Sequence, residues 1–486
     1  MTSRIWQGLA AGVAVLLFTG AGAGTMGGNR VQASPQAPGT TTLDDQVDLA
    51  VTVYNSDIAL VRDVRAIDLT RGTSDLHFMD IAATVNPTTV HFRSLTEPSR
   101  VGVLEQNYQY DLLEPEKLLK KYVGRDVTLV RQRNGREEEV QAHLVSYNNA
   151  PVWRIDGQIV TGLHADHIRF PELPGNLYAR PTLIWTLANE GASRHRVEAS
   201  YLATKLSWNA DYVLTVARDD KAGDLDGWVT VQNGSGTAFR NASLQLVAGD
   251  LNRVKQALGR VAMDSVAEFA APAAQRMAQE AFSDYHLYTL DRKTTINNNE
   301  TKQVSMLGAT SFPVIKRYVV SGQQFYYRNA QHPGAPIKDV VQVFYQLKNE
   351  AKSGLGEPMP AGIVRVYQAD SRGGLQFVGE DRIDHTPKDE TLNLKIGNAF
   401  DVVAERKQTD FQRVTSNVYD VEYEVTLRNH KAAGITVEVN EPIGGSWRML
   451  NASHKWTKND AWAAQFLVPV AAEGTTVVKY RVRVTY

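Results

Sequence analysis

Hydrophobic and polar residues alternate along most of the chain. The stretch "VDLAVTVYNSDIALVRDVRAIDL", which begins at Val47, gives short runs of Val, Ile and Tyr separated by turn residues. Period-2 alternation bounded by turn residues is typical of half-buried strands. From Arg196 the alternating runs lengthen, and they continue to the final "TVVKYRVRVTY". The pattern predicts an all-β protein with tandem β-domains and a C-terminal β-sandwich-like domain.

Two segments depart from this alternation. "LEPEKLLKKYVG" predicts one short helix near residues 114–124, because Pro115 suits the first helical position and Gly124 can end the helix. Residues 253–281 contain nine alanines and Pro272 but few β-branched residues. This composition predicts a helical or mobile insertion at the surface.

The patterns divide the chain into three folded parts. Residues 46–105 form an N-terminal β-domain, and residues 196–486 form a long β-domain that carries the insertion 253–281. Between them, residues 106–195 contain the short helix and the hairpin signals Asn-Gly, Asn-Asn and Asp-Gly. These signals predict a β-meander that resembles a small barrel.

The N-terminal residues predict export. Residues 1–33 contain one early positive charge, Arg4, an apolar run from Leu9 to Phe18, and small residues that favour cleavage after Ala33. This is the pattern of a signal peptide, although an uncleaved anchor is the alternative. Residues 34–45 are polar with two prolines and predict a flexible linker. We expect a periplasmic or secreted protein with no transmembrane segment after cleavage.

Composition narrows the classes of partner and cofactor. The formal net charge is -1, so no basic surface field is expected to hold nucleic acid. The chain has no cysteine, which excludes disulfides and thiol chemistry. Gly22-x-Gly24-x-x-Gly27 matches a dinucleotide fingerprint only by spacing, because it lies in the signal segment. We expect no cofactor.

One acidic stretch is the candidate for chemistry. "GEDRIDHTPKDETLNL", residues 379–394, brings four candidate catalytic residues together: Glu380, Asp381, His385 and Asp389. Alternation places Asp381 on the face of Ile383, where partial burial would perturb its pKa for acid/base or metal-assisted chemistry. The alternative is the solvated turn of a charged hairpin, started by Thr386-Pro387, with the acids in ion pairs. The pattern favours the hairpin, and we expect no metal.

Other candidate motifs have simpler interpretations. His164 and His167 have a chelating i, i+3 spacing only in a helix, and their context favours a loop or strand. "GDLDGWV" contains Asp224 and Asp226 but fails the calcium-loop template, so we expect a turn. Five tryptophans could form a surface on which a carbohydrate stacks. Each lies in an alternating, strand-like run, however, and this favours a position in the core. They are Trp208, Trp228, Trp447, Trp456 and Trp462.

Several phrases together resemble a known family. "YLATKLSWNADYVLTV", "GIVRVYQAD" and "FVGEDRIDHTPKDETLNLKIGNAFDVVAER" are similar to the DUF4139 family of bacterial envelope proteins over residues 196–486. Residues 47–95 are similar to the small β-domain that often precedes it. One related group, named mucoidy inhibitor A, has a coiled coil between these parts, whereas this chain has the helix and meander. The resemblance implies a β-rich exported bacterial protein but transfers no catalytic residue, because the family's function is not established.

Three functional hypotheses remain. The first is a non-catalytic envelope protein that contacts a protein or polysaccharide of the cell envelope, without nucleic acid. The second is a secreted hydrolase, with or without metal assistance, that uses the acidic and histidine cluster 380–390. The third is an assembly module that pairs through the edges of its sheets. The sequence leans away from an enzyme, since it contains no coherent catalytic motif.

Overall fold

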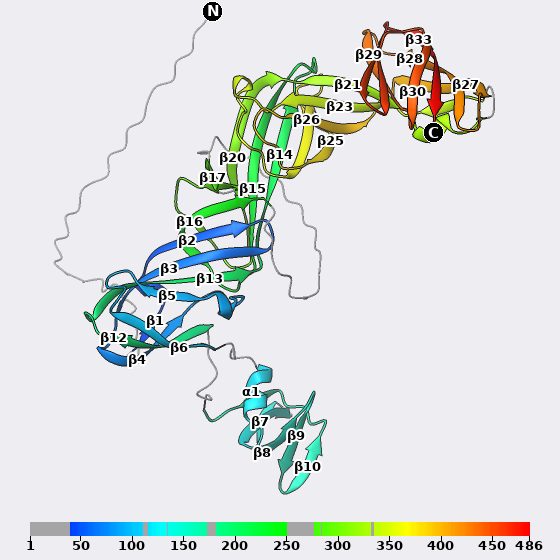
Figure 1. The fold of residues 1–486 in the computed structure, drawn as a ribbon. Helices are drawn as coiled ribbons and strands as arrows, with labels where there is room; N and C mark the ends of the chain where they lie inside the picture. The colour runs from blue at the N-terminus through cyan, green and yellow to red at the C-terminus, as the bar shows by residue number, and fades with distance from the viewer. Residues whose placement is uncertain are drawn as a thin grey trace, which may run out of the picture. The chain divides into compact units, whose positions relative to one another are not determined.

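The computed structural model describes residues 39–109, 115–133, 135–172, 181–249, 277–282, 284–331 and 335–486. Within these residues the chain is mainly β, as the alternation predicts, and strands dominate the ribbon in Figure 1. The predicted signal peptide, residues 1–33, lies outside the described residues. No helix in the described part of the chain is long and apolar enough to cross a bilayer.

Two sheets form the first sandwich. The smaller sheet has the spatial order β1 (Thr40–Thr41), β4 (Gly72–Met79), β12 (Thr182–Asn189) and β6 (Val101–Gln109). The larger sheet has the order β17 (Ala278–Phe282), β18 (Tyr285–Thr289), β16 (Phe239–Ala248), β2 (Gln46–Tyr54), β3 (Ile58–Asp68), β13 (Arg194–Thr204) and β5 (His91–Ser94), and β19 (Thr294–Ile296) also pairs with β16. Two 3₁₀ turns, η1 (Leu43–Asp45) and η2 (Pro87–Thr89), flank these strands. The Trp185 ring in β12 lies 4.6 Å from the Phe92 ring in β5, so the sheets bury their apolar faces together.

Strand pairing in the larger sheet joins distant parts of the sequence. β16 runs parallel to β2, and β13 pairs antiparallel with both β3 and β5. Val51, Val197 and Leu244 consequently belong to one hydrophobic core. Strands on both sides of residues 105 and 195 therefore share sheets, while the domain boundaries placed there stay a prediction.

A small unit with its own core follows β6 in the sequence. Its helix α1 (Pro115–Lys121) confirms the predicted helix and is the only α-helix in the described residues. Its sheet has the order β10 (Gln158–Thr161), β9 (Pro151–Ile155), β8 (Arg136–Tyr147), β7 (Asp126–Arg133) and β11 (His167–Arg169), as Figure 1 shows in part. Asp156 and Gly157 both have positive φ, which gives the tight turn expected between β9 and β10. Trp153 and Leu144 form the core with Leu118 of α1.

The central sandwich consists of a five-stranded sheet and part of a six-stranded sheet. The five-stranded sheet has the order β20 (Glu300–Pro313), β15 (Ala222–Asn233), β14 (Leu206–Val216), β24 (Gly362–Ala369) and β25 (Leu375–Ile383). The six-stranded sheet has the order β26 (Thr391–Asn398), β23 (Gln342–Lys348), β21 (Ile315–Ser321), β29 (Ile435–Pro442), β32 (Ala463–Val470) and β31 (Trp456–Asp460). Leu214, Val364 and Leu394 are buried together between them.

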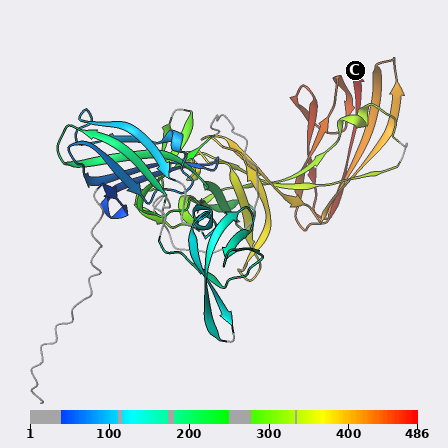
Figure 2. The ribbon, with the colours of Figure 1, turned by 90° about the horizontal axis from the view of Figure 1, so that it is seen from below.

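The C-terminal sandwich confirms the predicted C-terminal fold. Its second sheet has the order β22 (Ile337–Asp339), β27 (Val402–Arg413), β28 (Val418–Asn429), β33 (Gly474–Thr485) and β30 (Ser446–Ala452). Val425 and Val482 of this sheet pack with Val439 and Phe466 of the six-stranded sheet. Figure 2 shows β27, β28, β33 and β30 in orange to red. The 3₁₀ turns η3 (Gln324–Tyr327) and η4 (Ala351–Ser353) complete the elements of this half of the chain.

The flexible linker predicted for residues 34–45 is wrong from residue 40 onward. β1 pairs parallel with β4, and Thr41 is buried. Thr42 and Asp45 then form a capping box at η1, in which each side chain accepts the other's backbone N–H. These local hydrogen bonds and the β1 pairing order a segment whose polar composition alone favours a coil.

One further local prediction is wrong, and another is wrong only at its end. "GDLDGWV" forms no turn but lies inside β15, where Leu225 is buried and Asp224 and Asp226 are exposed. The predicted insertion 253–281 lies outside the described residues except at its end. There Met277 is buried and Ala278 starts β17, so this end belongs to the fold.

The charged hairpin predicted over residues 379–394 is also wrong. β25 pairs with β24, whereas β26 pairs with β23 in the opposite sheet. Residues 384–390 therefore connect two sheets of a sandwich. The sequence pattern cannot distinguish such a connection between two sheets from a hairpin within one sheet, because both contain two alternating runs and a polar turn.

Candidate functional site

The predicted acidic cluster is divided among separate structural contacts. Asp381 accepts the backbone N–H of Arg382 at 2.9 Å and that of Lys395 at 2.7 Å, so its carboxylate joins β25 to β26. Glu380 is exposed and lies 3.5 Å from Arg365 Nε. The contacts leave Asp381 with a scaffold role in this structure, since each of its oxygens already accepts a backbone hydrogen bond.

The other two candidates lie in the connection between the sheets. His385 is exposed, and its Nδ1 accepts the Ala361 N–H at 3.2 Å. Asp389 has φ +67° and donates its backbone N–H to the Asn349 carbonyl at 2.6 Å. Among the described residues, no group of three or more His, Asp or Glu side chains is placed to bind a metal.

The remaining sequence candidates take ordinary positions. His167 starts β11 and His164 lies in the preceding loop, both exposed, as the non-helical interpretation expects. Trp208 is buried in the core, as predicted, whereas the core position predicted for Trp462 is wrong, because Trp462 is 54% exposed. The Trp447 and Trp456 rings pack 5.6 Å apart where the edges of the two C-terminal sheets meet.

The C-terminal core contains a buried polar network around Arg406. This fully buried guanidinium lies 2.8 Å from Asp339 and 2.5 Å from Glu441. Tyr327 donates to Glu441 at 2.8 Å and lies 2.8 Å from the Tyr480 hydroxyl. Burial opposes the charge of Arg406, but Glu441 and Asp339 hold its pKa well above the ordinary value. Burial and then the charge of Glu441 raise the pKa values of Tyr327 and Tyr480 well above theirs.

Strongly perturbed groups often mark functional sites, but this network is closed to solvent. Arg406, Glu441, Tyr327 and Tyr480 are each no more than 1% exposed. A solute has no access to them without opening the sandwich. The network therefore acts as a structural element of the core in this conformation.

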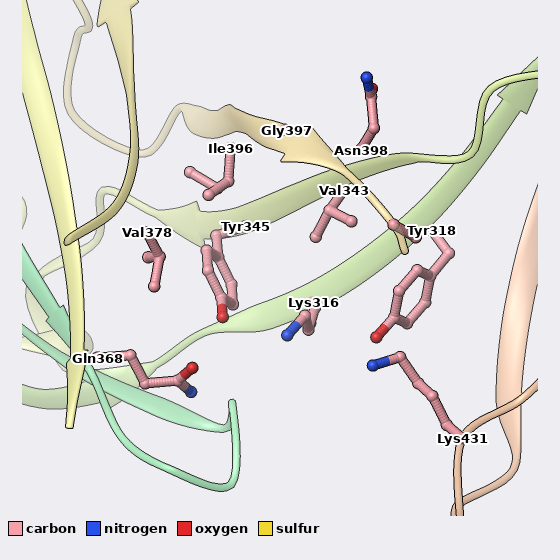
Figure 3. Close-up of a pocket in the computed structure, with 11 residues that line it drawn as sticks. Lys316, Tyr318, Val343, Tyr345, Gln368, Val378, Ile396, Gly397, Asn398 and Lys431 are labelled. Atoms are coloured by element: carbon pink, nitrogen blue, oxygen red, sulfur yellow. The ribbon is translucent and has the colours of Figure 1, made fainter. Parts of the chain in front are cut away.

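An open pocket lies at one end of the central sandwich. We call it the Tyr345 pocket, and its volume is about 190 Å³. Figure 3 shows its lining, which consists of Lys316, Tyr318, Val343, Tyr345, Gln368, Val378, Ile396, Gly397, Asn398, Ala399 and Lys431. Ligand sites are usually concave, with a mostly apolar lining and a small number of placed polar groups.

Alternation and register bring the central residues of the pocket together. Lys316 and Tyr318 are two residues apart in β21 and share a face, as do Val343 and Tyr345 in β23. The antiparallel register then sets Lys316 opposite Tyr345 and Tyr318 opposite Val343. These four side chains thus form one wall of the Tyr345 pocket.

Asp220, in the turn between β14 and β15, organises this wall. Its carboxylate accepts hydrogen bonds from Tyr345 Oη at 2.5 Å, Gln368 Nε2 at 2.9 Å and Lys316 Nζ at 3.0 Å. Burial, and then the hydrogen bond to Asp220, raises the pKa of Tyr345 above its ordinary value. Tyr345 is therefore a protonated hydroxyl at neutral pH, and it donates its proton in a hydrogen bond to the Asp220 carboxylate.

A second ammonium group lies on the far side of the pocket. Lys431 Nζ is 6.0 Å from the centre of the Tyr318 ring and 3.9 Å from Asp401 Oδ2. Figure 3 shows the Lys431 ammonium beside the Tyr318 ring. Burial first, and then the charges of Asp220 and Asp401, raise the pKa of Tyr318. The described lining thus contains two lysines and no acidic side chain.

The edges of the C-terminal sheets bear on the assembly hypothesis. β30 and β31 are terminal strands of the two sheets, and each has a register shift, at Met449/Asn451 and at Lys458/Asp460. Bulges and edge lysines discourage the addition of another strand. Assembly through sheet edges stays a prediction.

Sequence reasoning did not find the Tyr345 pocket. Its one local signal is Lys316, which shares the face of Tyr318 and Val320 although that face is otherwise apolar. Asp220 gives no signal, because an aspartate in a turn is ordinary. The site exists only through the pairing of β21 with β23 and the position of the β14–β15 turn.

Comparison with protein-family models gives a match over more than half of the chain. The model of a domain of unknown function, DUF4139, matches residues 197–486. No curated protein matches the chain.

Proposed function

The chain belongs to the DUF4139 family, and on this premise we propose that it is an exported, non-catalytic protein whose Tyr345 pocket binds an anionic sugar unit of an envelope polysaccharide. The observation that carries the proposal is the composition of the pocket. Lys316 and Lys431 are the only residues in its described lining that are charged at neutral pH, and the carboxylates that face them, Asp220 and Asp401, lie outside that lining. An anionic ligand group gains charge-assisted hydrogen bonds from such ammonium groups.

The neutral residues of the pocket suit a sugar ring. Tyr318 and Tyr345 combine ring faces with polar hydroxyls, as a sugar combines C–H faces with hydroxyls. Gln368 and Asn398 add amide groups to the same lining. Val343 and Ile396 supply apolar surface for the C–H face. A few polar groups on an apolar wall are the usual composition of a small-molecule site.

The size of the pocket limits the bound portion. Its volume of about 190 Å³ lies below the range of roughly 300–1,000 Å³ common for drug-sized ligands. The pocket therefore accommodates one small unit while the rest of a polymer remains outside. We expect modest affinity for each unit, which an extended polysaccharide can increase by offering many units.

The contacts of Asp220 support binding over hydrolysis. Three donors already occupy its carboxylate, so it is poorly placed to take a proton from water. Tyr345 is protonated and its hydrogen bond is committed to Asp220. The pocket offers donors and surfaces but no activated nucleophile among its described residues.

Export is part of the proposal and has its own test. The charge, apolar run and small residues of positions 1–33 support a cleaved signal peptide. Intact mass measurement of the protein purified from the envelope fraction should give an N-terminus at Ser34. A mature protein that still begins at Met1 in the cytoplasm would contradict export.

The binding test compares acidic and neutral oligosaccharides by isothermal titration calorimetry. We expect the full chain to bind oligo-uronates more tightly than neutral hexose oligomers, and this binding to weaken as salt screens the lysines. Lys431→Gln should weaken uronate binding about 10-fold, equivalent to roughly 1.4 kcal/mol. Lys388→Gln is the matched control, because Lys388 is exposed and does not line the pocket.

Two results would reject this function. One is the absence of uronate binding by a folded full-length protein. The other is an equal loss of affinity in the Lys431 and Lys388 variants, which would mean that the binding reflects net charge alone.

A further inference from the structure

A second cavity lies beside the edges of two sheets. We call it the methionine pocket, since Met277, Met306 and Met359 line it. It has a volume of about 390 Å³, within the range of roughly 300–1,000 Å³ usual for ligand pockets. Met277 precedes β17, Met306 lies in β20, and Met359 follows η4. Three of the eight methionines of the chain therefore meet at one place.

Hydrogen bonds hold the walls of the methionine pocket in place. Buried Asn349 accepts the Gly356 N–H at 2.9 Å and donates to the Glu357 carbonyl at 2.8 Å. The Tyr288 hydroxyl donates to the Pro358 carbonyl at 2.9 Å. The backbone of residues 356–358 is thus tied to the surrounding strands. The cavity is preformed, so a ligand does not have to order the loop on binding.

The lining of the methionine pocket favours a flexible apolar ligand. Methionine side chains are unbranched and polarisable, and they adapt to ligands of differing shape. Leu307 and Leu355 add apolar surface. The polar groups of Asn349 and Tyr288 are already hydrogen-bonded to the protein, so they do not need a hydrogen bond from the ligand.

The charge of Glu357 determines which head group the ligand can carry. Glu357 is exposed, and among the described lining residues it is the only one charged at neutral pH. An anionic head group would be repelled by this carboxylate, whereas a cationic one would be attracted. We propose that the methionine pocket binds an amphiphile that has an alkyl chain and a cationic head group, with the chain in the cavity and the head beside Glu357. This inference is independent of the Tyr345 pocket.

The test uses decyltrimethylammonium and decyl sulfate as probes, each below the concentration at which it forms micelles. Calorimetric titration of the full chain should give saturable binding of the cationic probe, about 10-fold tighter than binding of the anionic probe. Glu357→Lys should reverse this preference. The reversal separates recognition of the head group from simple partition of a detergent chain.

A matched pair of substitutions locates the binding. Ala278→Phe fills the lining at the start of β17, and Ala281→Phe places the same side chain at another exposed position of β17 outside the lining. We expect the first to reduce affinity at least about 10-fold and the second to leave it unchanged. Circular dichroism of both variants establishes that they are folded.

Four outcomes would overturn the proposal. Three of them are no saturable binding of decyltrimethylammonium, equal affinity for both probes, and equal effects of the two phenylalanines. Binding that occurs only after residues 251–275 are replaced by a Gly/Ser linker would also overturn it, because the cavity would then not be accessible in the natural chain.

Discussion

At the scale of single residues, similar side chains have different roles because their burial differs. Arg406 with Glu441 and Lys316 with Asp220 are both ion pairs that include tyrosine hydroxyls. The first pair is fully buried, and the second is about one quarter exposed. A buried charge that loses its partner cannot be solvated, so the first pair is critical for folding while the second remains available to a solute.

Glu441→Gln should destabilise the C-terminal sandwich by about 3–5 kcal/mol, because it removes the closest counter-charge of a buried guanidinium. Urea unfolding monitored by tryptophan fluorescence measures the change. Glu424→Gln is the control, since Glu424 forms an ion pair at 2.9 Å with Lys479, which is largely exposed. We expect that control to cost less than about 1 kcal/mol. Equal costs would contradict the role assigned to the buried network.

The Asp420–Arg483 pair predicts a dependence of stability on acid. These residues face each other across β28 and β33, with contacts of 2.6 and 2.8 Å, and hydrogen bonding to Arg483 lowers the pKa of Asp420 below 3.8. Between the lowered pKa and pH 3.8, the unfolded state binds more protons than the folded state. The stabilisation is therefore present above pH 3.8 and is lost as pH falls through the lowered pKa. The Tm difference between wild type and Asp420→Asn should therefore shrink below pH 3.8. A difference that stays constant from pH 7 to pH 2 would disagree with this account.

At the scale of elements, the central sandwich is closed along one side by the contact between β25 and β26. Asp381 reaches from β25 to the backbone of β26. Gly379 has φ +153°, and a Cβ there would lie 2.4 Å from the Ile396 carbonyl oxygen. Glycine is therefore required at this position both for its backbone conformation and for the close approach of the strands. The acidic stretch therefore joins two sheets, and we call this contact between β25 and β26 the seam.

Gly379→Ala should destabilise the protein by about 2–4 kcal/mol, from backbone strain together with the clash on Ile396. Gly397→Ala on the facing strand is the matched control, because no atom lies within 4 Å of its added Cβ. That substitution should change stability by less than about 1 kcal/mol. Thermal unfolding of the two variants provides the measurement. If Gly379→Ala melted at the wild-type temperature, the seam would not need close contact.

At the scale of the whole molecule, some sheets contain strands from the region matched by the family model together with strands from outside it. β13 and β16 lie within residues 197–486 or overlap their start, yet they pair with β3, β5 and β2 from the N-terminal part. Leu244 and Val247 of β16 are buried in the complete chain. The N-terminal strands are therefore required to complete the family domain in this protein.

Residues 197–486 expressed alone should aggregate or lose the cooperative transition of the full chain, because β16 would be left without β2. Thermal melting and size-exclusion chromatography test this. In the control, a short Gly/Ser turn replaces residues 110–181. Gln109 and Thr182 are already cross-strand neighbours, and residues 115–172 have their own core. This control should keep the main transition; an isolated fragment that melts like the full chain would refute the shared fold.

The sequence by itself determined the fold class, the short helix at Pro115–Lys121 and the long alternating strands of the C-terminal half. It did so because period-2 burial and turn chemistry are local properties, encoded within about ten residues. The resemblance carried by residues 196–486 was likewise confirmed by the family match. The capping box of Thr42 and Asp45 was not predicted, because the polar composition around it indicated a linker.

Only the tertiary structure decided which strands pair and which residues meet. The parallel pairs β2 with β16, β14 with β24 and β21 with β29 join segments that local patterns cannot connect. The same pairing separated β25 from β26 into different sheets and turned the expected hairpin into a seam. It also brought Asp220 to Lys316 and Tyr345, from 96 and 125 residues away in the sequence. Alternation fixes the face of a side chain, but the register between distant strands fixes its neighbours, and a binding site consists of neighbours.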